Sequence, residues 1–158
     1  MQGCRLRWAR FPDDRAAVED IFREYVHSPT ADLGFQNFEA EFAALPGPYA
    51  APEGGVLLGW GGSHVLGCAA LRRVGTDTTC CELKRVYVRP AGRGTGLGRA
   101  LVERMLGEAR ALGYHRMCLD VLPEFTAAQA LYESLGFVDA DPVSFNPVPG
   151  TRFLALDL

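Results

Sequence analysis

The segment from Cys80 to Phe137 constrains the fold of this 158-residue chain more than any other stretch. It opens with residues 81–88, which are rich in β-branched and aromatic side chains and therefore predict a strand. The strand is expected to end at Arg89-Pro90, because proline has no backbone donor and restricts the residue before it. A glycine-rich stretch follows at once, so the sequence predicts a strand that leads directly into a turn.

The rest of the segment has the pattern of a helix, a strand and a second helix. From Leu97 onward, apolar residues recur at helical spacing with charged residues between them, which predicts a one-sided helix closed by Gly113. Residues 115–121 predict a strand, and residues 126–135 predict a helix that ends at Gly136. The segment is therefore expected to fold as one β-turn-α-β-α unit.

Glycine occupies alternate positions in the turn, at Gly92, Gly94, Gly96 and Gly98. Without a Cβ, these residues let backbone N–H groups come close to a ligand. The first N–H groups of the following helix have no internal partner, and this end of a helix carries a partial positive charge. An anionic group, above all a pyrophosphate, suits such a turn.

Two other phosphate-binding patterns fit less well. A P-loop needs Gly-Lys-Ser/Thr, whereas Gly98 is followed by Arg99 and Ala100. A dinucleotide-binding fingerprint needs G-x-G-x-x-G or A, and no register of the four glycines supplies it. The remaining alternative is a glycine-rich connection that binds nothing.

The turn and its surroundings resemble a known family. Arg93-Gly94-Thr95-Gly96-Leu97-Gly98 fits the pattern of Gln or Arg, two residues, Gly, one residue, then Gly or Ala. With the order of elements around it, the segment resembles the acetyl-CoA-binding half of the GNAT N-acetyltransferases. The resemblance implies an α/β (α+β) domain with the GNAT acyl-CoA N-acyltransferase fold, a mixed and mostly antiparallel sheet with helices on both faces. We expect residues 1–158 to form this single domain.

The resemblance also implies acetyl-CoA as cosubstrate and no metal. Family members typically have a bulge in the strand before the turn, which frees backbone N–H groups to hold the pantetheine arm and the acetyl oxygen; by position these belong to Val86, Tyr87 and Val88. The residues expected to bind the diphosphate are Arg93, Gly94, Thr95, Gly96, Leu97, Gly98 and Arg99. Arg85 and Arg89 are expected to join Arg93 and Arg99 in a basic patch, which can equally be a solvated surface.

Two residues are assigned catalytic roles by the resemblance. Tyr132 lies in Ala-Leu-Tyr-Glu-Ser-Leu-Gly-Phe, which resembles the family's C-terminal helix signature, and its hydroxyl is expected to protonate the departing thiolate. The alternative is a core tyrosine bonded to a backbone carbonyl. Glu82 is the expected general base, acting on the acceptor ammonium through water; the alternative is an exposed, ion-paired glutamate. Strand alternation puts Glu82 on the side of Lys84, Val86 and Val88 unless a bulge resets it.

Other reactive side chains are less favoured. Cys80 and Cys81 could accept an acetyl group covalently, but no histidine beside them in the sequence would activate them. The five cysteines show no C-x-x-C spacing, so neither a zinc site nor a disulfide framework is indicated. His115 begins a strand far from the expected acceptor site, and His27 and His64 are interpreted as surface or loop residues.

The remaining sequence predicts the elements that surround this unit. Strands are expected at residues 5–10, 56–60, 65–74 and 152–158, with a hairpin turn at residues 61–63 and helices at residues 12–27 and 37–45. By resemblance, the acceptor pocket is formed near residues 35–41 and 145–151, where Phe35, Phe38, Phe145 and Asn146 are candidates. Many relatives place an asparagine at the start of the last helix, but this chain has Pro123-Glu124-Phe125-Thr126-Ala127.

Composition limits the partners and the compartment. A net charge of −3 argues against a nucleic-acid partner, and no apolar run approaches the roughly 20 residues that span a bilayer. No signal pattern begins the chain, so a cytoplasmic protein is expected; a homodimer is left open. The function hypothesis is acetyl transfer from acetyl-CoA to a primary amine of a small molecule in a ternary complex. The alternatives are a non-catalytic acetyl-CoA sensor and a protein-interaction domain.

Overall fold

The structure is a computed structural model that describes residues 4–158. Its strands form one mixed sheet in the order β1-β2-β3-β4-β5-β7-β6. They are β1 (Arg5–Trp8), β2 (Gly55–Gly61), β3 (His64–Val74), β4 (Asp77–Val88), β5 (Arg116–Val121), β6 (Val138–Asp139) and β7 (Arg152–Asp157). The helices are α1 (Arg15–Val26), α2 (Phe38–Ala43), α3 (Leu97–Ala111) and α4 (Thr126–Ser134), with short 3₁₀ turns η1 (Gly34–Gln36), η2 (Gly47–Tyr49) and η3 (Pro90–Gly92).

The sheet is antiparallel except between β4 and β5, which confirms the predicted mixed and mostly antiparallel arrangement. The parallel pairing is short: residues 80–82 of β4 pair with residues 116–118 of β5. Beyond Glu82 the two strands are no longer paired. The sheet therefore opens in its middle, on the side toward which β4 runs.

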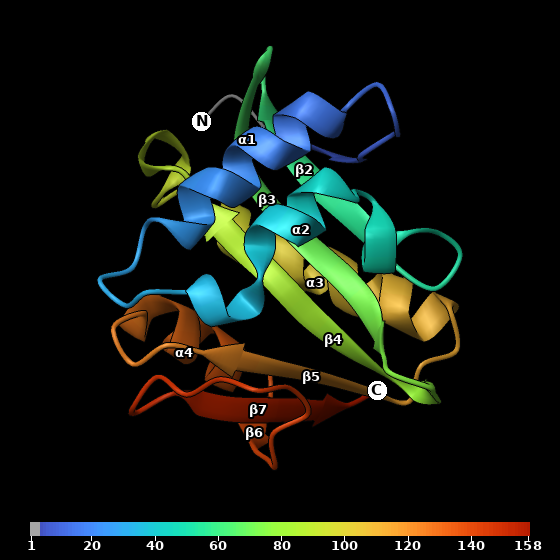
Figure 1. The fold of residues 1–158 in the computed structure, drawn as a ribbon, viewed down its shortest axis with the longest axis vertical. Helices are drawn as coiled ribbons and strands as arrows, with labels where there is room; N and C mark the ends of the chain where they lie inside the picture. Colours follow the sequence, from blue (N-terminus) through green and yellow to red (C-terminus); the bar gives the residue numbers. More distant parts are fainter. Residues whose placement is uncertain (1–3) are drawn as a thin grey trace.

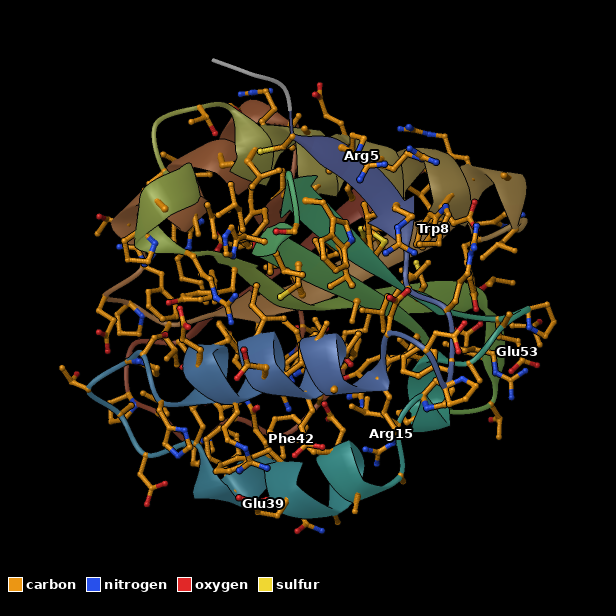
Figure 2. The ribbon with its side chains drawn as sticks, turned by 90° about the horizontal axis from the view of Figure 1, so that it is seen from above. Arg5, Trp8, Arg15, Glu39, Phe42 and Glu53 are labelled. Atoms are coloured by element: carbon orange, nitrogen blue, oxygen red, sulfur yellow. The ribbon has the colours of Figure 1, made fainter. Side chains whose placement is uncertain are left out.

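Helices cover both faces of the sheet. Figure 1 shows α1 and α2 in front of the strands and α3 behind them, and the same layers are seen from above in Figure 2. On the α1–α2 face, Phe42 lies between the two helices with its ring centroid 6.1 Å from that of Phe22. On the other face, Leu101 and Met105 of α3 pack with Tyr132 of α4 in a second core. α3 is amphipathic and buries its apolar side against the sheet, as the sequence pattern predicted.

A β-bulge interrupts β4 at Arg85. Ala70 of β3 pairs with Lys84 and Cys68 pairs with Tyr87, so Arg85 and Val86 together oppose a single residue. Arg85 has φ of 59°, a left-handed conformation that costs a non-glycine residue about 1–2 kcal/mol. Its guanidinium offsets part of this cost by bonding to both oxygens of Glu41 and to Gln36. The bulge that the family resemblance implied is confirmed.

The bulge changes which side chains of β4 share a face. Uninterrupted alternation would place Glu82 with Val86 and Val88, but Val86 and Val88 pack against the α3-side core. Glu82 pairs with Arg72 across the sheet, and Lys84 pairs with Ala70, whose side chain belongs to the α1–α2 core. Glu82 and Lys84 therefore lie on the α1–α2 face, because the extra residue reverses the phase of the strand.

Several element boundaries differ from the sequence prediction. β4 begins at Asp77 rather than residue 81, because a hairpin pairs polar, exposed residues that have no apolar alternation. The first strand ends at Trp8, and its helix begins only at Arg15, after Asp14 has accepted a hydrogen bond from the Arg10 N–H. The segment between the helix expected at residues 37–45 and the strand expected at residues 56–60 contains η2, and its Tyr49 is buried. β6 was not predicted, since two residues carry no periodicity.

No helix within residues 4–158 combines the length and the apolar character needed to cross a membrane.

Replacing Leu101 with alanine should test whether α3 is held mainly by apolar packing. Leu101 is fully buried between α3 and the sheet, so its truncation is expected to lower the free energy of unfolding by about 2–5 kcal/mol in urea denaturation. Leu112, at the end of the same helix, is 37% exposed and serves as the matched control, with an expected loss below about 1 kcal/mol. Equal losses for the two variants would contradict this packing.

Candidate functional site

A groove of about 580 Å³ lies where β4 and β5 have separated. One wall is the end of β4, another is the glycine-rich turn with the start of α3, and a third is the start of α4. Its lining includes Val86, Tyr87, Val88, Arg93, Gly94, Gly96, Leu97, Gly98 and Tyr132, all predicted from the sequence. It also includes Tyr25 and residues 124–128.

The end of β4 offers backbone donors to this groove. The Arg89 N–H bonds to the carbonyl oxygen of Leu66 on β3. Because successive N–H groups of a strand point to opposite sides, the Val88 N–H points toward the side that β5 has left. A ligand lying along this edge can accept from Val88 in the way that a neighbouring strand would.

The turn presents a second set of backbone donors. Gly94 and Gly96 have φ of 75° and 83°, and no atom lies within 4 Å of where a Cβ would be on either residue. The first recorded helical bond of α3 runs from the Ala100 N–H to the Gly96 carbonyl. The backbone N–H groups of residues 94–99 have no recorded backbone acceptor within the described chain. Several N–H groups at the positive end of α3 are therefore available to an anion.

The side chains of the turn have different roles. Arg93 lines the groove, donates to the Val88 carbonyl oxygen at 3.0 Å and lies over the Tyr87 ring. Thr95 and Arg99 do not line the groove: the Thr95 hydroxyl donates to the Gly92 carbonyl oxygen, and Arg99 donates to Ser134. Leu97 points into the core, so only its backbone can serve a ligand.

Two of the four arginines expected in a basic patch around the turn, Arg85 and Arg89, do not belong to one. Arg85 is buried beneath the sheet surface with its guanidinium bound to Glu41 and Gln36. Arg89 is held by Asp20, Glu24 and the Val65 carbonyl oxygen. Both contacts join residues far apart in the sequence, so spacing alone could not reveal them. Arg93 and Arg99 remain exposed beside the turn.

Tyr132 lies at the inner end of the groove. Its ring is buried and makes an edge contact with Phe137, and this burial raises the pKa of its hydroxyl above the ordinary value for tyrosine. Within residues 4–158 the hydroxyl has no recorded hydrogen-bond partner, and it is not among the completely enclosed unpaired atoms. A neutral hydroxyl with unused bonding capacity therefore faces the groove.

A second, smaller cavity of about 40 Å³ adjoins the groove on the α1–α2 side. The two share Tyr25, Val86, Phe125, Ala128 and Tyr132 as lining residues. Its polar lining is Gln36, Lys84, Arg85, Asp120 and Asn146. This volume admits a few water-sized groups, and the polar lining can hydrogen-bond to them.

Glu82 is close to this region but fully engaged. Its carboxylate is 2% exposed; Arg72 donates to one oxygen at 2.8 Å and the Ser144 hydroxyl donates to the other at 2.8 Å. It lines neither the groove nor the smaller cavity. Its role as general base stays a prediction, while Asp120 is the carboxylate that lines the smaller cavity.

Most of the other residues considered from the sequence do not line the smaller cavity. Asn146 lines the smaller cavity, whereas Phe35 and Phe145 contact each other with ring centroids 5.9 Å apart and Phe38 packs on Phe42. His27, His64 and His115 are exposed. Cys80 and Cys81 are buried free thiols whose pKa is raised by burial to about 12, which disfavours the reactive thiolate.

Sequence reasoning missed Tyr25, Lys84 and Asp120 as site residues. Tyr25 lies within the helix predicted at residues 12–27, which was given no site role, yet it lines both cavities, and burial raises its pKa to about 12. Asp120 interrupts the apolar run at residues 117–121 of β5, and a charged residue in a buried strand was the available signal.

Comparison with known proteins agrees with this geometry. The model of the acetyltransferase (GNAT) family matches residues 8–137. An uncharacterized N-acetyltransferase of Schizosaccharomyces pombe is 36% identical over 151 residues, which cover 94% of this chain and 91% of the relative. The L-amino acid N-acyltransferase MnaT of Escherichia coli is 41% identical over 68 residues, or 43% of this chain and 38% of its own length. The structure of yncA from Salmonella typhimurium, solved with its cofactor acetyl-CoA, has a TM-score of 0.71 and 26% identity, covering 99% of this chain and 94% of the other.

The chain belongs to the GNAT family of acetyltransferases. It has the fold of that family and is an acetyl-CoA-dependent N-acetyltransferase. The free amides of the turn and the end of β4 fit the two parts of coenzyme A that need donors, the diphosphate and the pantetheine arm.

Replacing Gly96 with alanine should weaken binding of coenzyme A at least about 10-fold in isothermal titration calorimetry, because a residue with a Cβ disfavours φ of 83° and the turn would redirect its N–H groups. Gly113→Ala is the matched control: Gly113 has φ of 88°, has equally open surroundings and lies at the far end of α3. Both variants should lose similar stability, but only Gly96→Ala should lose affinity. Unchanged affinity in Gly96→Ala would contradict the role of the turn.

Proposed function

We propose that the protein acetylates a primary amine of a small molecule, an amino acid or a related metabolite, by direct attack within a ternary complex. The observation that carries this function is the junction of the two cavities at Val86, Phe125 and Tyr132. A thioester held in the groove and an amine held in the smaller cavity would meet at this junction, as direct transfer requires.

The groove supports the cofactor half of the proposal. Acetyl-CoA supplies an acetyl group activated as a thioester. Backbone N–H groups at residues 94–99 and the positive end of α3 would hold its diphosphate, and Val86, Tyr87 and Val88 would hold the pantetheine arm. An N–H group on the open edge of β4 would also stabilise negative charge on the acetyl oxygen.

Transfer forms a nitrogen–carbon bond and breaks the carbon–sulfur bond, so one proton must leave nitrogen and one must reach sulfur. Tyr132 would donate the second proton; this is supported by a hydroxyl that burial keeps neutral and that has no recorded partner in the described chain. For the first proton, Glu82 remains the predicted base and would act through water, while Arg72 and Ser144 donate to its two oxygens. Asp120 is a second carboxylate in direct contact with the acceptor cavity.

A small acceptor suits both the cavity and the relatives. The polar lining and limited volume of the smaller cavity admit the amine end of a molecule rather than a folded protein surface. The Escherichia coli relative is named an L-amino acid N-acyltransferase, and a Salmonella typhimurium relative is named for acetylating L-methionine sulfoximine and L-methionine sulfone. These names favour amino acids among the small amines.

The Tyr132→Phe variant separates this enzyme from an acetyl-CoA sensor. Loss of a general acid typically costs about 10²- to 10⁴-fold, so kcat should fall by this order when free thiol is followed with acetyl-CoA and a panel of amino acids and amines. Affinity for coenzyme A and the midpoint of thermal unfolding should change little, because the hydroxyl has no protein partner among the described residues. A wild-type protein that binds coenzyme A but releases no thiol with any amine would support the sensor instead.

Glu82→Gln should lower kcat/KM by about 10²- to 10⁴-fold, the usual cost of losing a general base, if Glu82 removes the acceptor proton. Glu53→Gln is the matched control, because Glu53 also pairs with an arginine of β3 but is 56% exposed and lies away from both cavities. The control should retain the wild-type kcat/KM. A Glu82→Gln enzyme with the wild-type kcat/KM would assign the base role elsewhere.

A further inference from the structure

Among the described residues that line the acceptor cavity, Lys84 is a cation with no recorded hydrogen bond. The three guanidinium nitrogens of Arg85 are each bonded, to Glu41 or to Gln36. Lys84 has no hydrogen bond, and its nearest recorded partner is the Asp120 Oδ1, 3.6 Å from Nζ. Three ammonium donors are therefore available at the cavity surface.

The lack of hydrogen bonds at Lys84 is unusual because its side chain is nearly buried. Its side chain is only 10% exposed, and a nearly buried ammonium without hydrogen bonds is unfavourable unless something bonds to it. It is also the only lysine in the sequence: the other fifteen of the sixteen lysine and arginine residues are arginine. Lysine presents a compact charge with freely rotating donors, which suits a small anionic group in a confined cavity.

Asp120 has one carboxylate oxygen that accepts a hydrogen bond and one that has no recorded hydrogen bond. Its Oδ2 accepts from the Asn146 side-chain amide at 2.8 Å. Asn146 is held in turn, because its oxygen accepts from the Val148 N–H and the Thr151 hydroxyl. The Oδ1 of Asp120 faces Lys84 beyond hydrogen-bonding distance. A fixed carboxylate thus keeps one oxygen available for an ammonium donor.

We infer that Lys84 and Asp120 form a specificity pair that selects acceptors carrying a carboxylate next to the amine, the zwitterionic α-amino acids. Lys84 binds the acceptor carboxylate, and Asp120 orients the amine toward the junction at Tyr132. This role rests on the function proposed above and narrows its acceptor class.

The charges explain why an amino acid is preferred to a simple amine. Lys84 and Asp120 together are neutral, so an isolated cationic amine gains from Asp120 but is repelled by Lys84. A zwitterion places an opposite charge against each of them and adds no net charge to a desolvated site. The cavity of about 40 Å³ accommodates only the charged end, so the acceptor side chain would lie outside it.

The first experiment compares each of L-methionine and L-phenylalanine with its carboxamide, in which the carboxylate is neutral and the α-amine remains. With saturating acetyl-CoA and detection of free thiol, wild-type kcat/KM should be at least about 10-fold higher for the acids, which corresponds to a hydrogen bond to a charged group. Dividing each wild-type rate by the fraction of substrate whose amine is neutral at the assay pH corrects for the different basicity of acids and amides. Ratios of variant to wild type cancel the same difference.

Variants assign the preference to the pair. Lys84→Met should lower kcat/KM for the acids roughly 10- to 100-fold and should not lower it for the amides, which lose only a repulsion, whereas Lys84→Arg should recover part of the preference for the acids. Asp120→Asn should lower kcat/KM for acids and amides alike, because both carry the amine that Asp120 orients. Coenzyme A affinity is the folding control and should be unchanged in all three. If Lys84→Met fails to fold, calorimetric titration of wild-type protein with each acid and amide in the presence of coenzyme A measures the same preference.

Three results would overturn this role in distinguishable ways. Equal wild-type rates for acids and amides would reject carboxylate selection while leaving N-acetyl transfer to amines intact. An equal loss for acids and amides in Lys84→Met would make Lys84 a structural ion-pair residue only. If no amine of any kind releases thiol from acetyl-CoA, the proposed function fails and the specificity role fails with it.

Discussion

The end of hydrogen bonding between β4 and β5 after Glu82 is the constraint on which the rest of the site depends. Two neighbouring parallel strands normally satisfy each other's backbone groups, and here the second half of β4 lacks that partner on one side. The bulge at Arg85 adds a residue at this point and turns the strand, so that Val86 and Val88 face one layer while Lys84 stays on the other. The end of the pairing and the bulge together therefore separate the groove from the smaller cavity and leave the two joined at Tyr132.

Buried charges hold this irregular region in place. Arg85, in its left-handed conformation, ties the bulge to Glu41 of α2 and Gln36 of η1, and Arg72 and Ser144 occupy the two oxygens of Glu82. Such pairs cost desolvation, and they are tolerated where several hydrogen bonds satisfy each group. The same comparison singles out Lys84, whose ammonium has an ion-pair partner at 3.6 Å but no hydrogen bond.

The sequence predicted the parts of this arrangement that depend on local chemistry. Proline at residue 90, the glycines of the turn and the helical spacing from Leu97 each act within a few residues, and the strand-turn-helix unit followed from them. The position of Arg85, the pairing of Arg89 with Asp20 and Glu24, and the assembly of Lys84 with Asp120 depend on contacts between distant segments. Periodicity carries no information about such contacts. The two-residue β6 and the polar start of β4 were missed because neither has an apolar alternation.

The most direct measurement of the central claim is a ¹H–¹⁵N correlation spectrum of the protein titrated with coenzyme A. The N–H groups of residues 94–99 are free in the described chain and should accept the diphosphate, so their resonances should show the largest shifts, together with Val88 on the open edge of β4. Resonances of the hollow lined by Trp8, Phe11 and Tyr49, on another part of the molecule, should not move. Coenzyme A binding with unshifted N–H resonances at residues 94–99 would contradict the account.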